Sequence, residues 1–571
     1  MSGRLGLVLA LALVAAPVVY WSGGIVDEEA LGFLDSYWSD RSAPQVILNP
    51  RGYDFYQGRE LSYAVDFLDA QWIGYHARHD RFWFLPPSAV VASLGVVAAF
   101  RWGAPRALPG LAGGTAWLAL LLYLSNFVFM STMGTLYRAG KPLVAPLLLF
   151  ALLFSLRERR RAPEEAGAPV WPLFAGGAVM SLLDRQGLFY LGCLTLALGF
   201  AWVRSRHGGR LVLAAAAAVC VTLAYNYLLG PWLIHRANGY WPSMEFQALR
   251  PGWLADPRAW LQGLAVLRDW TLLLFGGLPG GLVPAGILVV LALALVLWAR
   301  REAPPRGDPA LIAMLLLGVV AQVAMVAVMA RRHEPITWID HRIWYYPIVY
   351  QVVVVFGLLW LLERISVARG GSLPRLVPVA LLCLVTLNIA HWPHLEQVLR
   401  SGPWGADVLR RSDLLKSSLR SGDPGPLLDG DHRRFLFQCR DRFAPLAARM
   451  SAHVSEGAGV DRTEILEGRL FARGRAESHV VAFAPASGRY RLEGGLYLRP
   501  GESVSFALGA RQLGSVFRHA EFPGLDLFSF PMELPVGTTD VTLSAHLTGT
   551  EPPEDRRFGL HLPFYLRPGD D

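Results

Sequence analysis

The sequence predicts a polytopic α-helical membrane protein with a β-sandwich domain after its last membrane span. The 571 residues are 53% hydrophobic and only 17% charged. Apolar runs long enough to cross the hydrocarbon core of a bilayer recur along residues 1–392. From residue 465 onward, apolar and polar residues alternate with the period of two that is typical of strands.

About eleven membrane spans are expected. They lie near residues 4–22, 84–100, 109–130, 142–156, 168–183, 186–203, 211–234, 271–299, 309–330, 343–362 and 376–392. The first run also has the length of a signal peptide, but no small-x-small cleavage site precedes the acidic segment, so an uncleaved span is preferred. The two runs around Asp184 are short, and a single broken element is the alternative there.

The basic residues predict the orientation. The net charge is +8, almost all of it from arginine, and the only lysines are Lys141 and Lys416. The arginines gather in short loops after the even-numbered spans, which predicts a cytoplasmic N-terminus and an extracytoplasmic C-terminal domain. This placement explains the charge without a nucleic-acid partner. The outer loops 23–83, 235–270 and 331–344 are rich in aromatic and charged residues, so chemistry is expected on that side.

Three regions follow from these patterns. Residues 1–392 form the membrane domain, residues 393–464 a polar linker with helical stretches, and residues 465–571 the sandwich, of jelly-roll type. Turn signals such as "RPGE" and "PVGTTD" separate its strands. Whether the sandwich binds carbohydrate or only covers the membrane domain is left open, because fold analogy alone supports the first role.

An acidic segment follows the first span directly. Asp27, Glu28 and Glu29 come six to eight residues after Trp21, where the apolar run ends. Negative charge favours the N-terminus of a helix, so these residues fit a simple helix start. Alternatively, a carboxylate at the membrane surface has its pKa raised by partial burial and acts as a general base.

The first span, the Asp-Glu pair and the long first outer loop resemble the GT-C class of membrane glycosyltransferases. This class includes the protein O-mannosyltransferases and the aminoarabinose-type lipid A transferases, and the resemblance covers residues 1–392. It implies a polyprenyl-phosphate sugar as donor, a bacterial inner membrane location, and a first-loop acid as base, here Asp27 with Glu28 as its neighbour. Residues 49–71 replace the Lys-Pro-Pro-type segment of many members, which leaves the sugar and the acceptor open.

Cationic side chains on the same side are candidates for the donor phosphate. Arg138 and Lys141 stand three residues apart between spans three and four, where the fork of arginine and the point charge of lysine suit a phosphate. Contact with lipid headgroups is the alternative. Arg185 is a second candidate, because charges at membrane depth usually face a partner or a wet cavity, although an interaction of Asp184 and Arg185 with other loops is the simpler account.

The first outer loop combines aromatic and charged residues that suit a sugar. Arg51, Tyr53, Asp54 and Arg59 are the candidates, in a segment that also contains Tyr56 and Glu60. An interfacial amphipathic helix, with Leu61, Val65 and Leu68 on the membrane side, is also expected here, and the two interpretations are compatible.

The loop "RRHEPITWIDHRIW" contributes Arg342 as another phosphate candidate. Its two histidines and two carboxylates suggest a divalent metal, but their spacing matches no compact metal site. No cofactor is therefore expected, and a divalent metal is the alternative that is not favoured. The predicted function is transfer of a sugar, with inversion, from a polyprenyl-phosphate donor to a lipid, glycan or protein acceptor. The alternatives are a transporter or lipid flippase, a surface-polysaccharide ligase or polymerase, and a non-catalytic glycan-binding scaffold.

Overall fold

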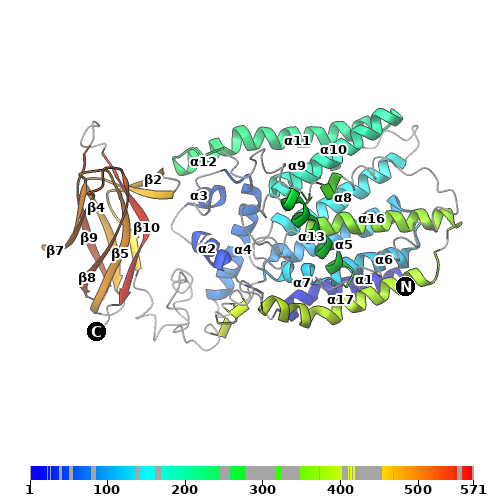
Figure 1. The fold of residues 1–571 in the computed structure, drawn as a ribbon, viewed down its shortest axis with the longest axis horizontal. Coiled ribbons are helices and arrows are strands. Elements are labelled where there is room, and N and C mark those ends of the chain that lie inside the picture. Colours follow the sequence, from blue (N-terminus) through cyan, green and yellow to red (C-terminus); the bar gives the residue numbers. More distant parts are fainter. Residues whose placement is uncertain are drawn as a thin grey trace.

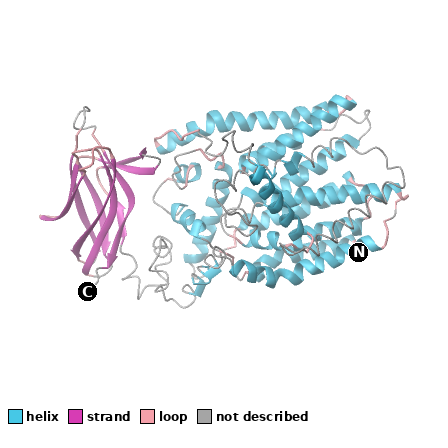
Figure 2. Ribbon diagram, viewed as in Figure 1, coloured by secondary structure: helices cyan, strands magenta, loops and turns pink. Residues whose placement is uncertain are grey.

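The structure is a computed structural model with a helical bundle and a separate β-sandwich (Figures 1 and 2). It describes residues 2–21, 24–25, 28–37, 42–50, 56–78, 85–135, 140–160, 169–244, 257–276, 317–320, 322–323, 347–371, 373–401, 409–410, 412–414, 416–417, 453–466, 469–484, 487–535, 537–548 and 556–568.

The bundle contains most of the helices. They are α1 (Gly3–Tyr20), α2 (Glu28–Tyr37), α3 (Ala43–Leu48), α4 (Glu60–Arg78), α5 (Pro87–Ala107), α6 (Gly113–Ser125), α7 (Phe127–Gly134), α8 (Gly140–Arg160), α9 (Trp171–Leu183), α10 (Arg185–Ser205), α11 (Gly209–Ala224), the π-helix η2 (Tyr225–Leu229), α12 (Gly230–Asn238), α13 (Pro257–Leu274), α16 (Pro347–Ala368) and α17 (Leu376–Ser401). Within the described residues, seven helices are long and apolar enough to cross a membrane, or eight if α6 and α7 form one bent span. The predicted polytopic helical fold is confirmed.

The predicted count of eleven spans is not confirmed. Two of the predicted runs, 271–299 and 309–330, lie largely outside the described residues. The pair around Asp184 is two helices, α9 and α10, rather than one broken element. They pack against each other as a hairpin: a Cβ on Gly177 would lie 3.0 Å from Leu191, and both residues are seven positions from the turn at Asp184.

The two ends of the bundle differ in charge. One end, here called the basic end, holds the arginines at the end of α8, of which Arg160 bonds to Glu363 of α16 through both guanidinium nitrogens at 2.7 and 2.6 Å. At the same end, the Arg157 guanidinium lies 5.4 Å from the centre of the Trp102 ring. The opposite end, here called the loop end, holds the first residues of α8 and α10 and the N-terminal part of α4.

The third predicted span is broken at Asn126, where α6 and α7 meet at an angle of 55°. The Asn126 side chain caps α7 by accepting a hydrogen bond from the Phe129 amide at 3.0 Å. A break inside a membrane domain frees backbone carbonyls that water cannot reach, so protein groups must satisfy them.

Helix α17 supplies those groups. The Asn388 amide donates to the Leu122 carbonyl and the Ser125 hydroxyl, both at 3.2 Å, and to the Leu274 carbonyl at 3.0 Å. The Trp392 indole donates to the Ser125 carbonyl at 2.7 Å. The bend is therefore held from outside, and it directs the end of α7 towards the segment that follows α1.

We expect Asn388→Leu to lower the stability of the bundle, because it leaves buried carbonyls of the break without donors. The loss should be about 1–3 kcal/mol, read as a lower midpoint of thermal unfolding in detergent. Thr386→Val is the matched control, since Thr386 is exposed and bonds only to the Leu382 carbonyl of its own helix. Equal midpoints for the two variants would contradict this account of the break.

The C-terminal domain is a sandwich of two antiparallel five-stranded sheets, with strand orders β1-β4-β9-β6-β7 and β2-β3-β10-β5-β8. Leu492, Phe506 and Leu543 are fully buried between the sheets. The strands are β1 (His453–Glu456), β2 (Val460–Leu466), β3 (Arg469–Gly474), β4 (Glu477–Ala484), β5 (Gly488–Leu498), β6 (Ser503–Leu508), β7 (Arg511–Phe517), β8 (Gly524–Leu534), β9 (Gly537–His546) and β10 (Phe558–Pro568).

The sandwich begins earlier than the predicted boundary at residue 465. Strand β1 pairs with β4, and β2 pairs with β3, so both belong to the sheets. Strand β2 carries three charged residues, which hides the alternation that marks the later strands.

Candidate functional site

Helix α4 packs against α5, α8 and α9 at the loop end. Asp69 anchors it by accepting a hydrogen bond from the Ser88 amide, in the first turn of α5, at 3.0 Å, and a second bond comes from the Ser88 hydroxyl. An acidic side chain at this position also complements the positive end of the α5 dipole. The N-terminal part of α4 lies close to the start of α8, because a Cβ on Gly140 would lie 2.7 Å from the Ser62 hydroxyl.

Asp184, in the turn between α9 and α10, is the centre of a polar cluster. Its carboxylate accepts from the Lys141 ammonium at 3.0 Å and from the Gln186 amide at 2.9 Å, which caps α10. The Arg59 Nε lies 3.4 Å from the same carboxylate. The side chains of Lys141 and Asp184 are only 4% and 5% exposed, so this ion pair is buried.

The charges of this cluster decide the state of the carboxyl group. Burial by itself would raise the pKa of Asp184, but Lys141 and Arg59 outweigh it and lower that pKa to about 2. Asp184 is therefore ionised, and the stabilisation that it adds is present above its ordinary pKa and lost only as the pH falls towards 2.

Arg185 adds a third cation. Its guanidinium donates to the Tyr56 carbonyl and is close enough to Arg59 for the two guanidinium groups to repel each other. Arg59, Lys141 and Arg185 therefore all lie close to the carboxylate of Asp184. We call Arg59, Lys141, Asp184 and Arg185 the cation cluster.

A buried acid lies beside the cation cluster. Glu60 is 6% exposed, and burial raises its pKa to about 7, although a hydrogen bond with Tyr56 and the charge of Arg185 act in the opposite direction. The Tyr56 hydroxyl also lies 3.2 Å from the Asn226 amide oxygen. Only glycine fits at Gly230, because a Cβ there would lie 2.1 Å from that hydroxyl.

A short bridge brings two distant segments together near the cation cluster. The Ile25 amide donates to the Gly134 carbonyl at 2.7 Å, and Ile25 pairs in parallel with Thr135. In the sequence, Asp27 follows two residues after Ile25 and Arg138 three residues after Thr135. The bridge therefore joins the two chain segments that lead to the predicted base and to the predicted phosphate ligands.

The structure brings together three of the predicted substrate-binding residues, Arg59, Lys141 and Arg185. Outside the described residues lie Asp27, Arg51, Tyr53, Asp54, Arg138 and Arg342. Glu28 is the first residue of α2, so the helix-start interpretation agrees with the backbone there. Asp184 was not predicted as a site residue, and Glu60 was predicted only as a member of the aromatic and charged first-loop segment. Their signals were weak, because a charge between two apolar runs and a charge at a helix start each have ordinary structural explanations.

The apolar face of α4 differs from the prediction. Leu61 and Val65 pack against the hydrophobic core instead of facing the membrane. The exposed apolar side chains are Leu68, Trp72 and Tyr75, with exposed fractions of 65%, 48% and 53%. These three share one helix face, and aromatic residues of this kind are typical of a membrane interface.

Among the described residues, no group of three or more His, Cys, Asp or Glu side chains is arranged to hold a metal ion. The loop 331–344, which motivated the metal alternative, lies outside them.

We expect Glu60→Gln to flatten the dependence of stability on pH. A folded-state pKa of about 7, above the ordinary value of 4.5, means that the folded protein holds a proton that the unfolded chain releases. Stability should then fall as the pH rises from about 4.5 to about 7 in the parent protein, and the variant should lose this slope. Unfolding midpoints in detergent at several pH values measure it, and the same slope in both proteins would contradict the burial effect.

No family model and no curated protein matches this sequence. Among solved structures, the chain is similar to the crystal structure of ArnT from Cupriavidus metallidurans bound to undecaprenyl phosphate. The match has a TM-score of 0.44 and 14% sequence identity, and it covers 78% of this chain and 74% of ArnT. A similarity at this level assigns no activity to this chain. What the residues themselves establish is a multi-pass helical membrane protein with a C-terminal β-sandwich and a buried cation cluster at its loop end.

Proposed function

We propose that this chain is a membrane glycosyltransferase of the GT-C type that uses a polyprenyl-phosphate sugar as donor and inverts the anomeric centre. The cation cluster is the observation that carries the proposal. Two arginines and a lysine at one point suit the oxygens of a phosphate monoester or diester, because arginine offers a planar fork of donors and lysine a point charge.

The backbone at the cation cluster also favours an anion. Helices α8 and α10 begin at Gly140 and Arg185, so both present their N-terminal ends there. Helix N-termini carry positive partial charge, which suits phosphate. The start of α8 packs closely here. A Cβ on Gly140 would lie only 2.7 Å from the Ser62 hydroxyl and 2.8 Å from the Leu183 carbonyl, so a glycine is needed for this approach.

The reaction is a single displacement. The base, Asp27, takes the proton of an acceptor hydroxyl while that oxygen forms a bond to the anomeric carbon. The bond from the anomeric carbon to the phosphate oxygen breaks at the same time, and the polyprenyl phosphate leaves with the electron pair. The leaving group is already an anion, so its stabilisation by Arg59, Lys141 and Arg185 would be the main electrostatic contribution.

Glu60 is a second candidate for the base. Its pKa of about 7 is close to working pH, as general-base catalysis requires, and it lies beside the cation cluster. Asp27 is preferred because it comes two residues after Ile25 in the sequence. The Ile25–Thr135 bridge joins the segment that contains Asp27 to the segment that leads to Lys141.

The orientation follows from charge. By the positive-inside rule, the basic end faces the cytoplasm, which places the N-terminus there and the cation cluster and the sandwich outside. We propose the inner membrane of a bacterium as the location. The acceptor is a lipid, a glycan or a protein, and transport, polysaccharide ligation and scaffolding are the competing functions.

We expect Lys141→Met to weaken binding of polyprenyl phosphate at least tenfold, about 1.4 kcal/mol, because it removes a buried cation from the cation cluster. Binding of a radiolabelled polyprenyl phosphate to the purified protein in nanodiscs measures this. Arg204→Gln is the matched control, since Arg204 is an exposed cation at the basic end of α10. If Lys141→Met binds polyprenyl phosphate as tightly as the parent protein does, the cation cluster is not the phosphate site.

Two substitutions of acids separate the functions. Asp27→Asn should abolish turnover of a polyprenyl-phosphate sugar but retain binding of polyprenyl phosphate. Glu60→Gln should retain most of the turnover if Asp27 is the base, and the reverse result would assign the base to Glu60. A scaffold or a transporter would consume no donor in membranes that contain acceptor. The proposal would therefore be overturned if the parent protein left every sugar of a broad polyprenyl-phosphate panel intact.

A further inference from the structure

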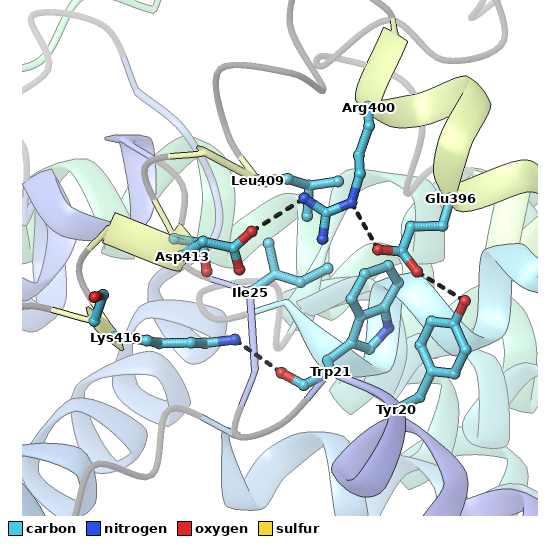
Figure 3. Close-up of a pocket in the computed structure, with 10 residues that line it drawn as sticks. Tyr20, Trp21, Ile25, Glu396, Arg400, Leu409, Asp413 and Lys416 are labelled. Carbon is cyan, nitrogen blue, oxygen red and sulfur yellow. Dashed lines mark hydrogen bonds and ion pairs between the residues drawn. The ribbon is translucent and has the colours of Figure 1, made fainter. Parts of the chain in front are cut away.

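We propose that a second site, a cavity of about 570 Å³ next to α1 and α17, binds a neutral, hydroxyl-rich group of the saccharide class and presents it as the acceptor (Figure 3). This inference rests on the proposed glycosyltransferase function and specifies its acceptor. The volume lies within the range of about 300–1,000 Å³ that is usual for small-molecule sites.

The cavity lies where three segments meet at the loop end. Tyr20 and Trp21 come from the end of α1, Glu396 and Arg400 from the last two turns of α17, and Asp413 and Lys416 from the segment that follows. Figure 3 shows these side chains around one space.

Hydrogen bonds and ion pairs fix the walls. The Arg400 guanidinium donates to Glu396 at 2.7 Å and to Asp413 at 3.0 Å. The Tyr20 hydroxyl donates to the other Glu396 oxygen at 2.8 Å, and the Lys416 ammonium donates to the Trp21 carbonyl at 2.8 Å. The segment around residues 413–416 is thereby tied both to α17 and to the end of α1.

The charges of this cavity differ from those of the cation cluster. Among the described residues that line it are two cations, Arg400 and Lys416, and two carboxylates, Glu396 and Asp413, and their formal charges cancel. Both cations already bind groups of the chain, so a phosphate is expected to bind at the cation cluster instead. Donors and acceptors of both kinds instead match the hydroxyl groups of a sugar, each of which donates and accepts.

The aromatic wall also suits a sugar. Trp21 is held in place because its indole donates to the Met130 carbonyl at 3.1 Å and its ring packs on Gly134, where a Cβ would lie 2.3 Å away. The Tyr20 and Trp21 rings meet edge to face, with centroids 5.0 Å apart. Trp21 is itself buried, and the half-buried Tyr20 ring that it holds lines the cavity and offers an apolar surface at low entropic cost to the C–H face of a pyranose.

The position of the cavity links it to the reaction. Ile25 lines it and also forms the bridge to Thr135, beyond which the chain leads to Lys141 of the cation cluster. Ile25 stands two residues before Asp27 in the sequence. The cavity is therefore bordered by the segment that leads to the proposed base.

A cysteine-protection experiment tests the cavity. Ser417 lines it and is exposed, so Ser417→Cys, made in the full chain with its native cysteines replaced by serine, should fold and react with a maleimide in nanodiscs. Alkyl glucoside, alkyl galactoside and alkyl maltoside are the probes. We expect at least one of them to slow the reaction several-fold, while polyprenyl phosphate leaves the rate unchanged.

Ser401→Cys is the matched control, because Ser401 is an exposed serine at the end of α17 and does not line the cavity. Protection by none of the three glycosides, equal slowing at both positions, or protection by polyprenyl phosphate would overturn the inference. None of these results depends on turnover. A negative result in the protection experiment would therefore reject the acceptor cavity, whereas unchanged phosphate binding by Lys141→Met would reject the cation cluster as the phosphate site.

Discussion

The buried ion pair between Lys141 and Asp184 is the constraint on which the loop end of the bundle depends. Taking either charge out of water alone is prohibitive, and breaking such a pair typically costs about 3–5 kcal/mol. The pair therefore holds the start of α8 against the turn between α9 and α10. Arg59 joins from the start of α4, so three elements distant in the sequence meet at one carboxylate.

The break at Asn126 works together with this pair. A straight helix in place of α6 and α7 would not carry Gly134 and Thr135 to Ile25. The bend requires donors from α17. The last two turns of the same helix contain Glu396 and Arg400, which line the neutral cavity. Helix α17 therefore stabilises the bend with its middle and forms a wall of the cavity with its end.

Two polar sites of different charge thus flank one bridge. The cation cluster is the proposed phosphate site, and the neutral cavity is the proposed site for hydroxyl groups. In the proposed reaction, this separation would let a charged donor and an uncharged acceptor bind without competing for one site. The end of α1 also contributes to the cavity, so the first span is part of a site as well as a membrane anchor.

The sequence alone determined the membrane class, the polytopic helical fold and the C-terminal sandwich, because hydrophobic length and period are local properties that do not depend on partners. It also singled out Arg59, Lys141 and Arg185, since a cation beside an apolar run is conspicuous in a single chain. It did not reveal that Asp184 would gather them, that Glu60 would be buried, or that α6 and α7 would bend at Asn126. Those features arise from contacts between residues that are far apart in sequence, up to 267 positions for Trp392 and Ser125. Only the tertiary structure decides such contacts, because burial and charge pairing are properties of the packed helices rather than of any one segment.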